Sequence, residues 1–82
     1  MSERVQSFLE QMILLNGPIS AGKALEVYYS IFADVDPFRD REEAILSMFI
    51  TKWYETNRDR EVSYGMFVRE YAEYYAKVNE NR

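Results

Sequence analysis

Few side chains in this sequence could support catalysis or bind a metal. The chain has no cysteine and no histidine, whereas aspartate and glutamate together number 14. Without a thiol or an imidazole it cannot assemble a Cys-His pair, a Ser-His-Asp triad, or a zinc or copper site of the usual kind. Paired carboxylates would need a pocket that separates their pKa values, and small helical domains rarely enclose one. We therefore expect no enzymatic activity, no cofactor and no metal.

Three aspartates, Asp34, Asp36 and Asp40, lie close enough together to suggest a calcium loop. An EF-hand loop has a glycine at its sixth position and a glutamate at its twelfth. Counting from the first aspartate, these positions hold Arg39 and Ile45, so the comparison fails. Roles in turns and helix caps account for the three aspartates instead.

Three aromatic doublets, Tyr28-Tyr29, Trp53-Tyr54 and Tyr74-Tyr75, are the strongest indication of a function. Neighbouring helical residues point roughly 100° apart, so a narrow buried stripe cannot hide both rings of a doublet. Exposed tyrosines and arginines are typical of protein interfaces. The predicted interface residues are Tyr29 and Tyr75, then Tyr54 and Tyr64, with Arg58, Arg60 and Arg69 as a polar rim. The alternative is that these rings only border a core that contains Tyr28, Trp53, Tyr71 and Tyr74.

Length and composition indicate one small globular domain over residues 1–82. Apolar residues make up 48% of the chain and aromatic residues 16%, which argues against intrinsic disorder. The net charge of −4 includes no block of five like charges, so neither a polybasic arm nor an acidic tail is predicted. The apolar runs are too short to cross a bilayer, and the first residues lack the pattern of a secretory signal. We expect a cytoplasmic protein that does not enter a membrane.

The spacing of apolar residues predicts an all-α fold. No segment shows the sustained alternation of apolar and polar residues that is typical of a strand. Apolar residues recur instead every three or four positions. In residues 38–56 they cover more than one stripe of the expected helix. We expect that third helix to be central, with contacts on two sides. The prediction is a compact bundle of four helices at about residues 3–15, 20–33, 38–56 and 63–79.

Polar residues at the helix ends agree with these limits. The predicted N-caps are Ser2, Ser20, Asp40 and Ser63. Asp40 and Glu43 have the spacing of a capping box, in which the two residues bond reciprocally to each other's backbone. Within Asn16-Gly17-Pro18, Gly17 is expected to end the first helix in the left-handed conformation. Residues 57–61 are polar throughout and predict a loop.

The segment Leu14-Leu15-Asn16-Gly17-Pro18-Ile19-Ser20-Ala21 resembles the turn of winged-helix and helix-turn-helix regulators. In those proteins a short Gly-Pro turn precedes a helix that opens with Ser and Ala, so the resemblance implies a small DNA-binding transcriptional regulator. A DNA reader needs cations on its recognition helix. The predicted second helix offers Lys23, which Glu26 balances, and the cations of residues 39–60 alternate with acidic residues. Autonomous nucleic-acid binding is therefore disfavoured.

The sequence favours a small non-catalytic protein-binding module that acts stoichiometrically through an aromatic-rich helical surface. Acidic helical domains of this size are frequent among accessory proteins and inhibitors of bacteria and phages. Blocking of a host complex by such a viral protein is therefore a sub-hypothesis, on size and composition alone. The expected partner is another protein or protein complex, and a homodimer is left open. The DNA-binding regulator is the alternative, and a structural subunit of a larger assembly is the third option.

Overall fold

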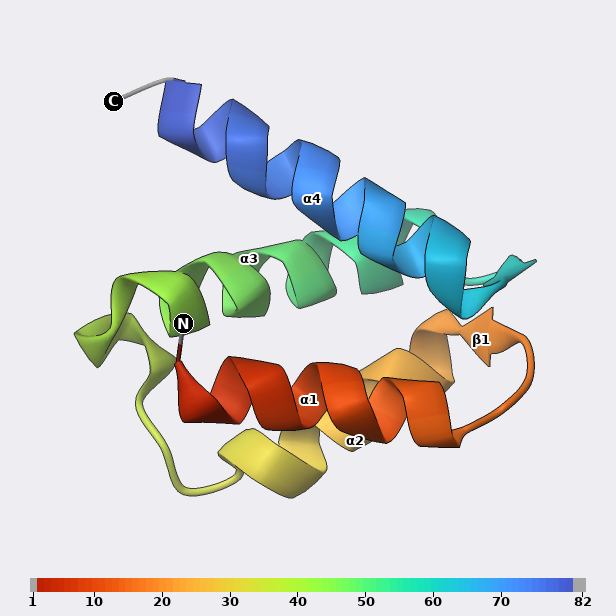
Figure 1. Ribbon diagram of the computed structural model, residues 1–82, viewed down its shortest axis with the longest axis horizontal. Helices are drawn as coiled ribbons and strands as arrows, with labels where there is room; N and C mark the ends of the chain where they lie inside the picture. The colour runs from red at the N-terminus through yellow and green to blue at the C-terminus, as the bar shows by residue number, and fades with distance from the viewer. Residues whose placement is uncertain (1, 81–82) are drawn as a thin grey trace.

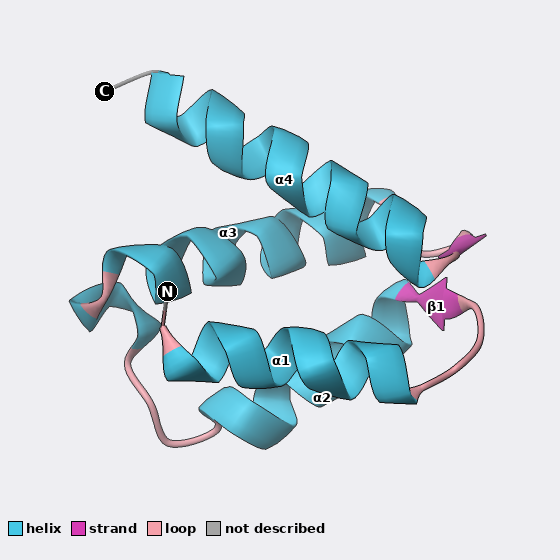
Figure 2. Cartoon of the chain, viewed as in Figure 1, coloured by secondary structure: helices cyan, strands magenta, loops and turns pink. Residues whose placement is uncertain are grey.

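The computed structural model describes residues 2–80 and confirms the all-α fold of four helices (Figures 1 and 2). The helices are α1 (Glu3–Leu14), α2 (Ala21–Phe32), α3 (Arg41–Thr56) and α4 (Tyr64–Glu80). Residues 1, 81 and 82 of the predicted domain lie outside the described part of the chain. Within the described part, no helix combines the length and the apolar character that crossing a membrane requires.

Helix α3 is the central element, because α1, α2 and α4 all pack against it. Its buried apolar side chains cover a wide arc, as the apolar pattern predicted: Ile45, Leu46, Phe49, Ile50 and Trp53. Helices α1 and α2 also pack on each other. Figure 1 shows α4 lying across α3 and diverging from α1 toward its C-terminal end. Helix α4 consequently buries only Phe67 and Tyr71 fully.

Phe67 is the residue that joins α4 to the rest of the core. It is 0% exposed, and its ring contacts the rings of three residues that belong to two other helices, α1 and α3. The centroid distances are 5.1 Å to Trp53, 5.6 Å to Phe49 and 6.1 Å to Phe8. Aromatic rings at such separations attract one another beyond the effect of burial alone. One phenyl ring therefore couples α1, α3 and α4.

A short antiparallel ribbon, which the apolar pattern did not predict, ties two connections together. Strand β1 (Ile19–Ser20) pairs with β2 (Glu61–Val62), so that Ile19 lies opposite Val62. Both of these side chains are buried. A strand of two residues is too short to show alternation, so its sequence gives no periodic signal. The loop predicted at residues 57–61 therefore ends in a strand.

All four predicted N-cap residues cap their helices, and one helix, α3, begins later than predicted. Side-chain oxygens of the predicted cap residues accept hydrogen bonds from first-turn N–H groups in all four helices: Ser2, Ser20, Asp40 and Ser63. Helix α3 begins at Arg41 rather than near residue 38, because Pro37–Arg39 form a separate 3-10 turn, η1. Asp36 caps that turn, and proline at the following position keeps Asp36 out of the helical conformation.

The left-handed residue that ends α1 is Asn16, not Gly17 as predicted. Asn16 has a φ of 50°, and none of the glycines has a positive φ. The turn needs a single left-handed residue, and asparagine tolerates this conformation better than most side chains do. The chain therefore adopts the left-handed conformation one residue before the glycine at which it was predicted.

The predicted capping box at the start of α3 forms only in part. The Glu43 N–H donates to Asp40 Oδ1 at 3.0 Å, as expected. The Glu43 carboxylate instead accepts from Ser2 Oγ at 2.5 Å and from Arg4 Nη1 at 3.3 Å. Because Glu43 is only 5% exposed, this buried carboxylate links the first turn of α3 to the first turn of α1.

Candidate protein-binding surface

In the doublet on α2 one ring is buried and the other is exposed, as expected for neighbouring residues of a helix. Tyr28 is buried and stacks on Phe32 with a centroid distance of 4.6 Å. Tyr29 is 58% exposed, and its ring meets the edge of Tyr28 at 5.6 Å. Tyr29 is therefore an exposed large aromatic residue, although its ring contact lies within its own helix.

The doublet on α3 is less exposed, as expected for the central helix. Trp53 is buried and Tyr54 is half-buried against the core. The Arg58 guanidinium carbon lies 4.7 Å from the centroid of the Tyr54 ring. This cation–π contact occupies both residues within the molecule and leaves Arg58 less free to act as an interface rim.

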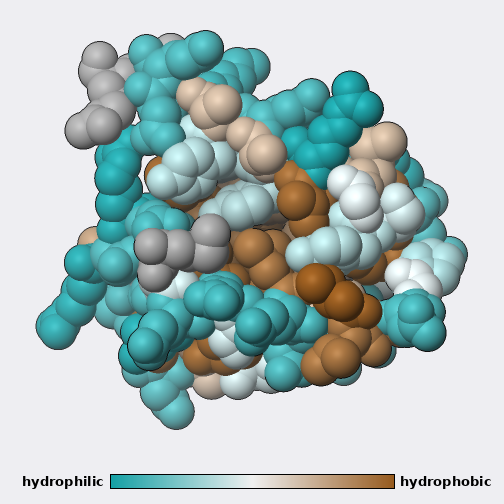
Figure 3. All heavy atoms as spheres, in the orientation of Figure 1, coloured by the Kyte–Doolittle hydropathy of each residue, from teal (hydrophilic) through white to brown (hydrophobic). Residues whose placement is uncertain are grey.

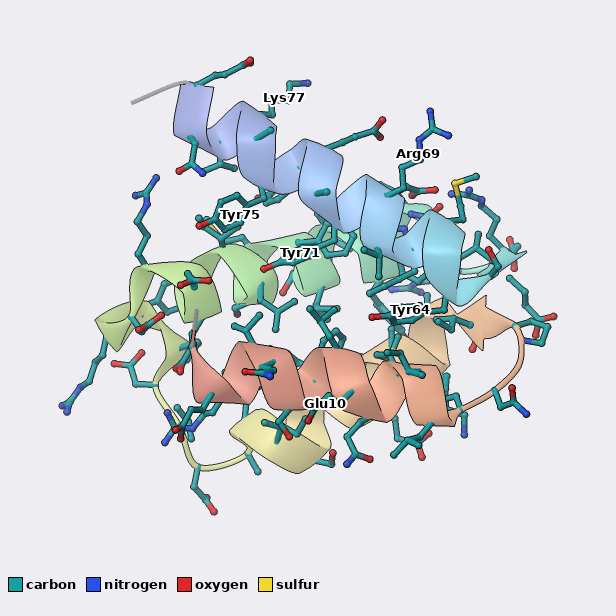
Figure 4. All side chains as sticks on the ribbon, viewed as in Figure 1. Glu10, Tyr64, Arg69, Tyr71, Tyr75 and Lys77 are labelled. Carbon is teal, nitrogen blue, oxygen red and sulfur yellow. The ribbon has the colours of Figure 1, made fainter. Side chains whose placement is uncertain are left out.

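The tyrosines of α4 lie on the side of that helix that faces the core. Figure 4 shows Tyr64, Tyr71 and Tyr75 projecting from α4 toward α3 and α1. Tyr71 and Tyr75 are in edge contact at 6.2 Å, and Tyr74 packs on Phe49 at 5.6 Å. Burial, with smaller effects of Tyr75 and Glu42, raises the pKa of Tyr71 to about 12. Burial also raises the pKa of Tyr64.

Arg60 is exposed and takes part in a hydrogen-bonded network within the molecule. Its Nη2 lies 2.8 Å from Glu70 Oε2, and its Nη1 donates to Asn57 Oδ1 at 2.6 Å. Glu70 Oε1 also accepts the indole N–H of Trp53 at 2.9 Å. The hydrogen bond from Arg60, together with that from Trp53, holds the pKa of Glu70 below its usual value. Sequence reasoning had no signal for this network, since its members come from three separate segments.

Glu70 should make the free energy of unfolding depend on pH in the acidic range. Because its pKa is lower in the folded state, it contributes stability above its unfolded pKa near 4.5, and this contribution is lost as the pH falls through the folded pKa. Glu70→Gln should lower the free energy of unfolding at pH 7 by about 0.5–1 kcal/mol, since the pair is partly exposed. Urea unfolding at pH 7 and pH 3 measures this, and the difference from wild type should shrink at pH 3.

Glu70→Ala separates the two roles of this side chain. It also removes the acceptor for the buried Trp53 N–H, so it should cost about 1–3 kcal/mol more than Glu70→Gln at pH 7. An Arg69→Gln variant is the control, because Arg69 has an exposed side chain and its ion pair with Glu73, at 3.8 Å, lies at the surface. Equal acid profiles for wild type and Glu70→Gln would contradict the assigned role.

The predicted interface residues are therefore spread over several parts of the surface. Tyr29, Tyr54 and Tyr75 lie on α2, α3 and α4 respectively. Each ring contacts a residue within four positions in the chain: Tyr28, Arg58 and Tyr71. Tyr64 borders a hollow beside the end of α1, and Arg69 borders a groove between α3 and α4. Their role in binding stays a prediction, and the structure does not assemble them as one patch.

The groove between α3 and α4 has an apolar floor and a charged rim. Phe49, Trp53 and Tyr74 line it together with Met66, which is 39% exposed. Its charged lining residues are of both signs: Lys52, Arg69, Glu70 and Glu73. The groove has a volume of about 560 Å³ and is open to solvent. Such a shape suits a side chain or a short segment of another protein better than an enclosed small molecule.

A second hollow continues this groove along α3. It is lined by Phe38 and Met48, which are 65% and 39% exposed. Lys52 and Thr56 line both hollows, so the two form one continuous surface. We call it the α3 surface and define it by Phe38, Met48, Lys52, Met66 and Tyr74. Sequence reasoning missed both methionines because it considered only aromatic doublets and arginines.

The α3 surface combines exposed apolar side chains with charged side chains of both signs. Within residues 2–80, no group of three or more Asp, Glu, His or Cys side chains is arranged to hold a metal ion. Comparison of the chain with protein-family models, with curated proteins and with solved structures gives no match. The function must therefore be inferred from the surface itself.

Proposed function

We propose that this protein is a non-catalytic protein-binding module that docks a partner on the α3 surface and acts by occupying part of that partner. The observation that carries the proposal is the exposure of Phe38, Met48 and Met66 on two hollows that share lining residues. Exposed large apolar side chains that adjoin one another are costly in water, and they mark interaction sites in soluble proteins. Unbranched, polarisable methionines also adapt to the shape of a partner.

The charges around the α3 surface favour a protein partner. Lys52 and Arg69 alternate there with Glu55, Glu70 and Glu73. An apolar centre with a mixed polar rim is the usual anatomy of a protein interface. A surface for duplex DNA needs a positive field that releases counterions from phosphates, and these acidic residues offset such a field. Protein binding is therefore favoured over the regulator of the helix-turn-helix type.

Affinity capture with matched variants tests the proposal. Phe38→Ser and Met48→Ser should each reduce the amount of captured partner about tenfold or more, because truncating a central apolar anchor typically removes 2 kcal/mol or more of binding energy. Neither side chain belongs to the buried core, so circular dichroism and the melting temperature should change little. Quantitative mass spectrometry of the proteins captured from the host lysate provides the measurement.

Tyr29→Ser is the control variant, since Tyr29 is also a large exposed side chain but lies on α2. It should capture the partner as wild type does. If Tyr29→Ser loses the partner while Phe38→Ser and Met48→Ser retain it, the α3 surface is not the binding site. Binding of duplex DNA at low salt, with a steep loss as salt rises, would instead support the DNA-binding alternative.

A further inference from the structure

Helix α4 carries an uncharged stripe beside the face that packs on the core. Gly65, Val68, Ala72 and Tyr75 follow one another at intervals of three, four and three residues, which places them on one face of a helix. Gly65 and Ala72 are exposed, and the other two are half-buried. Figure 3 shows apolar and pale residues along this front side of α4, above a hollow toward α1. We call these four residues the α4 seam.

The order of large and small residues in the α4 seam is self-complementary in one orientation. When two copies of α4 run antiparallel, with their crossing point near position 70, Val68 meets Ala72 of the partner subunit. Tyr75 then meets Gly65 of the partner subunit, so every large side chain faces a small one. In a parallel pair Tyr75 would face Tyr75 of the partner subunit and the two glycines would leave a gap. Two helices pack closely only where their side chains interdigitate.

The charge distribution is compatible with a second copy at this place. The whole chain has a net charge of −4, so two copies repel each other over most of their surfaces. The α4 seam contains no charged residue. Arg69, which lies next to the α4 seam on the other edge from the tyrosines in Figure 4, is paired with Glu73 at 3.8 Å. Two copies can therefore meet here without burying an unpaired charge.

The apolar surface extends beyond the α4 seam at its N-terminal end. Tyr64 and Ile13 line the same hollow, and Ile13 of α1 is 53% exposed. A partner helix laid along the α4 seam would reach this apolar end and cover additional area. A single helix pair buries less surface than a standard protein interface, so the association should be weak and concentration-dependent.

We propose that two copies of this chain associate through an antiparallel pair of α4 helices, with the α4 seam as the contact. This inference does not depend on the proposed function, because the α4 seam and the α3 surface have no residue in common. The α4 seam involves Tyr75, one of the two preferred interface residues predicted from the sequence, and assigns it a second copy as its partner.

Matched glycine variants provide the sharpest test. A methyl group added at Gly65 meets nothing closer than Ser63 Oγ at 3.9 Å, and one added at Gly22 meets nothing within 4 Å. Both glycines are the second residue of their helix, so Gly65→Ala and Gly22→Ala should each raise the melting temperature of the monomer. Only Gly65→Ala should also weaken the dimer, by about threefold or more, because its methyl group occupies the place of Tyr75 of the partner subunit.

Sedimentation velocity over a wide concentration range measures the dimer. Wild type should shift from monomer toward dimer as its concentration rises, and Ala72→Glu should weaken association at least about tenfold by placing a charge in the contact. Ala33→Glu, an exposed site at the end of α2, is the charge control and should behave as wild type. A strict monomer at millimolar concentration, or a dimer unaffected by Ala72→Glu and Gly65→Ala, would overturn the proposal.

The absence of native cysteine allows the orientation to be tested directly. When Val68→Cys and Ala72→Cys proteins are mixed and oxidised, disulfides between the two variants should exceed disulfides within either variant. Predominance of the Val68→Cys homodimer would indicate a parallel pair and contradict the proposed arrangement. Phe38→Ser should leave association unchanged, so failure of this inference and failure of the proposed function can be distinguished.

Discussion

Phe67→Ala is expected to lower the free energy of unfolding by about 3–5 kcal/mol, the usual cost of removing a fully buried phenyl ring. The ring is 0% exposed and contacts the rings of Phe8, Phe49 and Trp53. Its removal leaves a cavity between three helices, and the central helix cannot move into that cavity without leaving its other neighbours. Natural domains are stable by only about 5–15 kcal/mol, so this variant should be close to unfolding at 37 °C.

Urea unfolding followed by circular dichroism measures this effect. Met66→Ala is the matched control, because Met66 precedes Phe67 on the same helix and is 39% exposed. It should cost less than about 1 kcal/mol. If Phe67→Ala costs no more than Met66→Ala, then α4 is not anchored through this ring and the packing of α4 on α3 would have to be revised.

The second large effect is a loss of stability in alkali that depends on Tyr71. Its pKa is raised to about 12 in the folded protein, against about 10 for an unfolded tyrosine. Below pH 10 both states keep the proton, so the full contribution is present. Between pH 10 and pH 12 only the unfolded state loses its proton, and the free energy of unfolding should fall by up to about 2–3 kcal/mol.

Tyr71→Phe isolates this contribution, because it keeps the ring and removes the titrating hydroxyl. Its free energy of unfolding should decline less steeply than that of wild type between pH 10 and pH 12. In an absorbance titration of the folded wild type, a late ionisation step near pH 12 should be observed, and the Tyr71→Phe protein should lack it. Tyr29→Phe, on a largely exposed ring, is the control. Parallel decline in wild type and Tyr71→Phe would contradict the assignment.

Much of the fold could be predicted because the decisive interactions are local. The apolar spacing of α1 to α4 and the cap residues at their first turns act within a few positions of the chain. The same reasoning identified α3 as central, because its apolar residues cover more than one stripe. It also separated Tyr28 from Tyr29, since adjacent helical residues must point in different directions.

Errors arose where a local rule allowed more than one outcome. Either Asn16 or Gly17 could provide the left-handed residue after α1, and the chain uses the former. Glu43 had the spacing to complete a capping box, but its carboxylate binds Ser2 and Arg4 of another helix. The ion pair of Arg60 with Glu70 was likewise not predicted, because no local rule joins the loop after α3 to the middle of α4. For Glu43 and Arg60, a partner on another element decided the result.

By itself, the sequence determined the four helices, their caps and the exclusion of thiol and imidazole chemistry, because residue type and short-range spacing fix these properties. Only the tertiary structure decided which exposed residues adjoin one another. Phe38, Met48 and Met66 come from η1, α3 and α4, and they form one surface only because α4 crosses α3 at this point. Likewise, Gly65 and Ala72 of the α4 seam are exposed on a helix that diverges from α1. Such adjacency depends on how the helices cross, and helix crossing results from packing of the whole core rather than from any one segment.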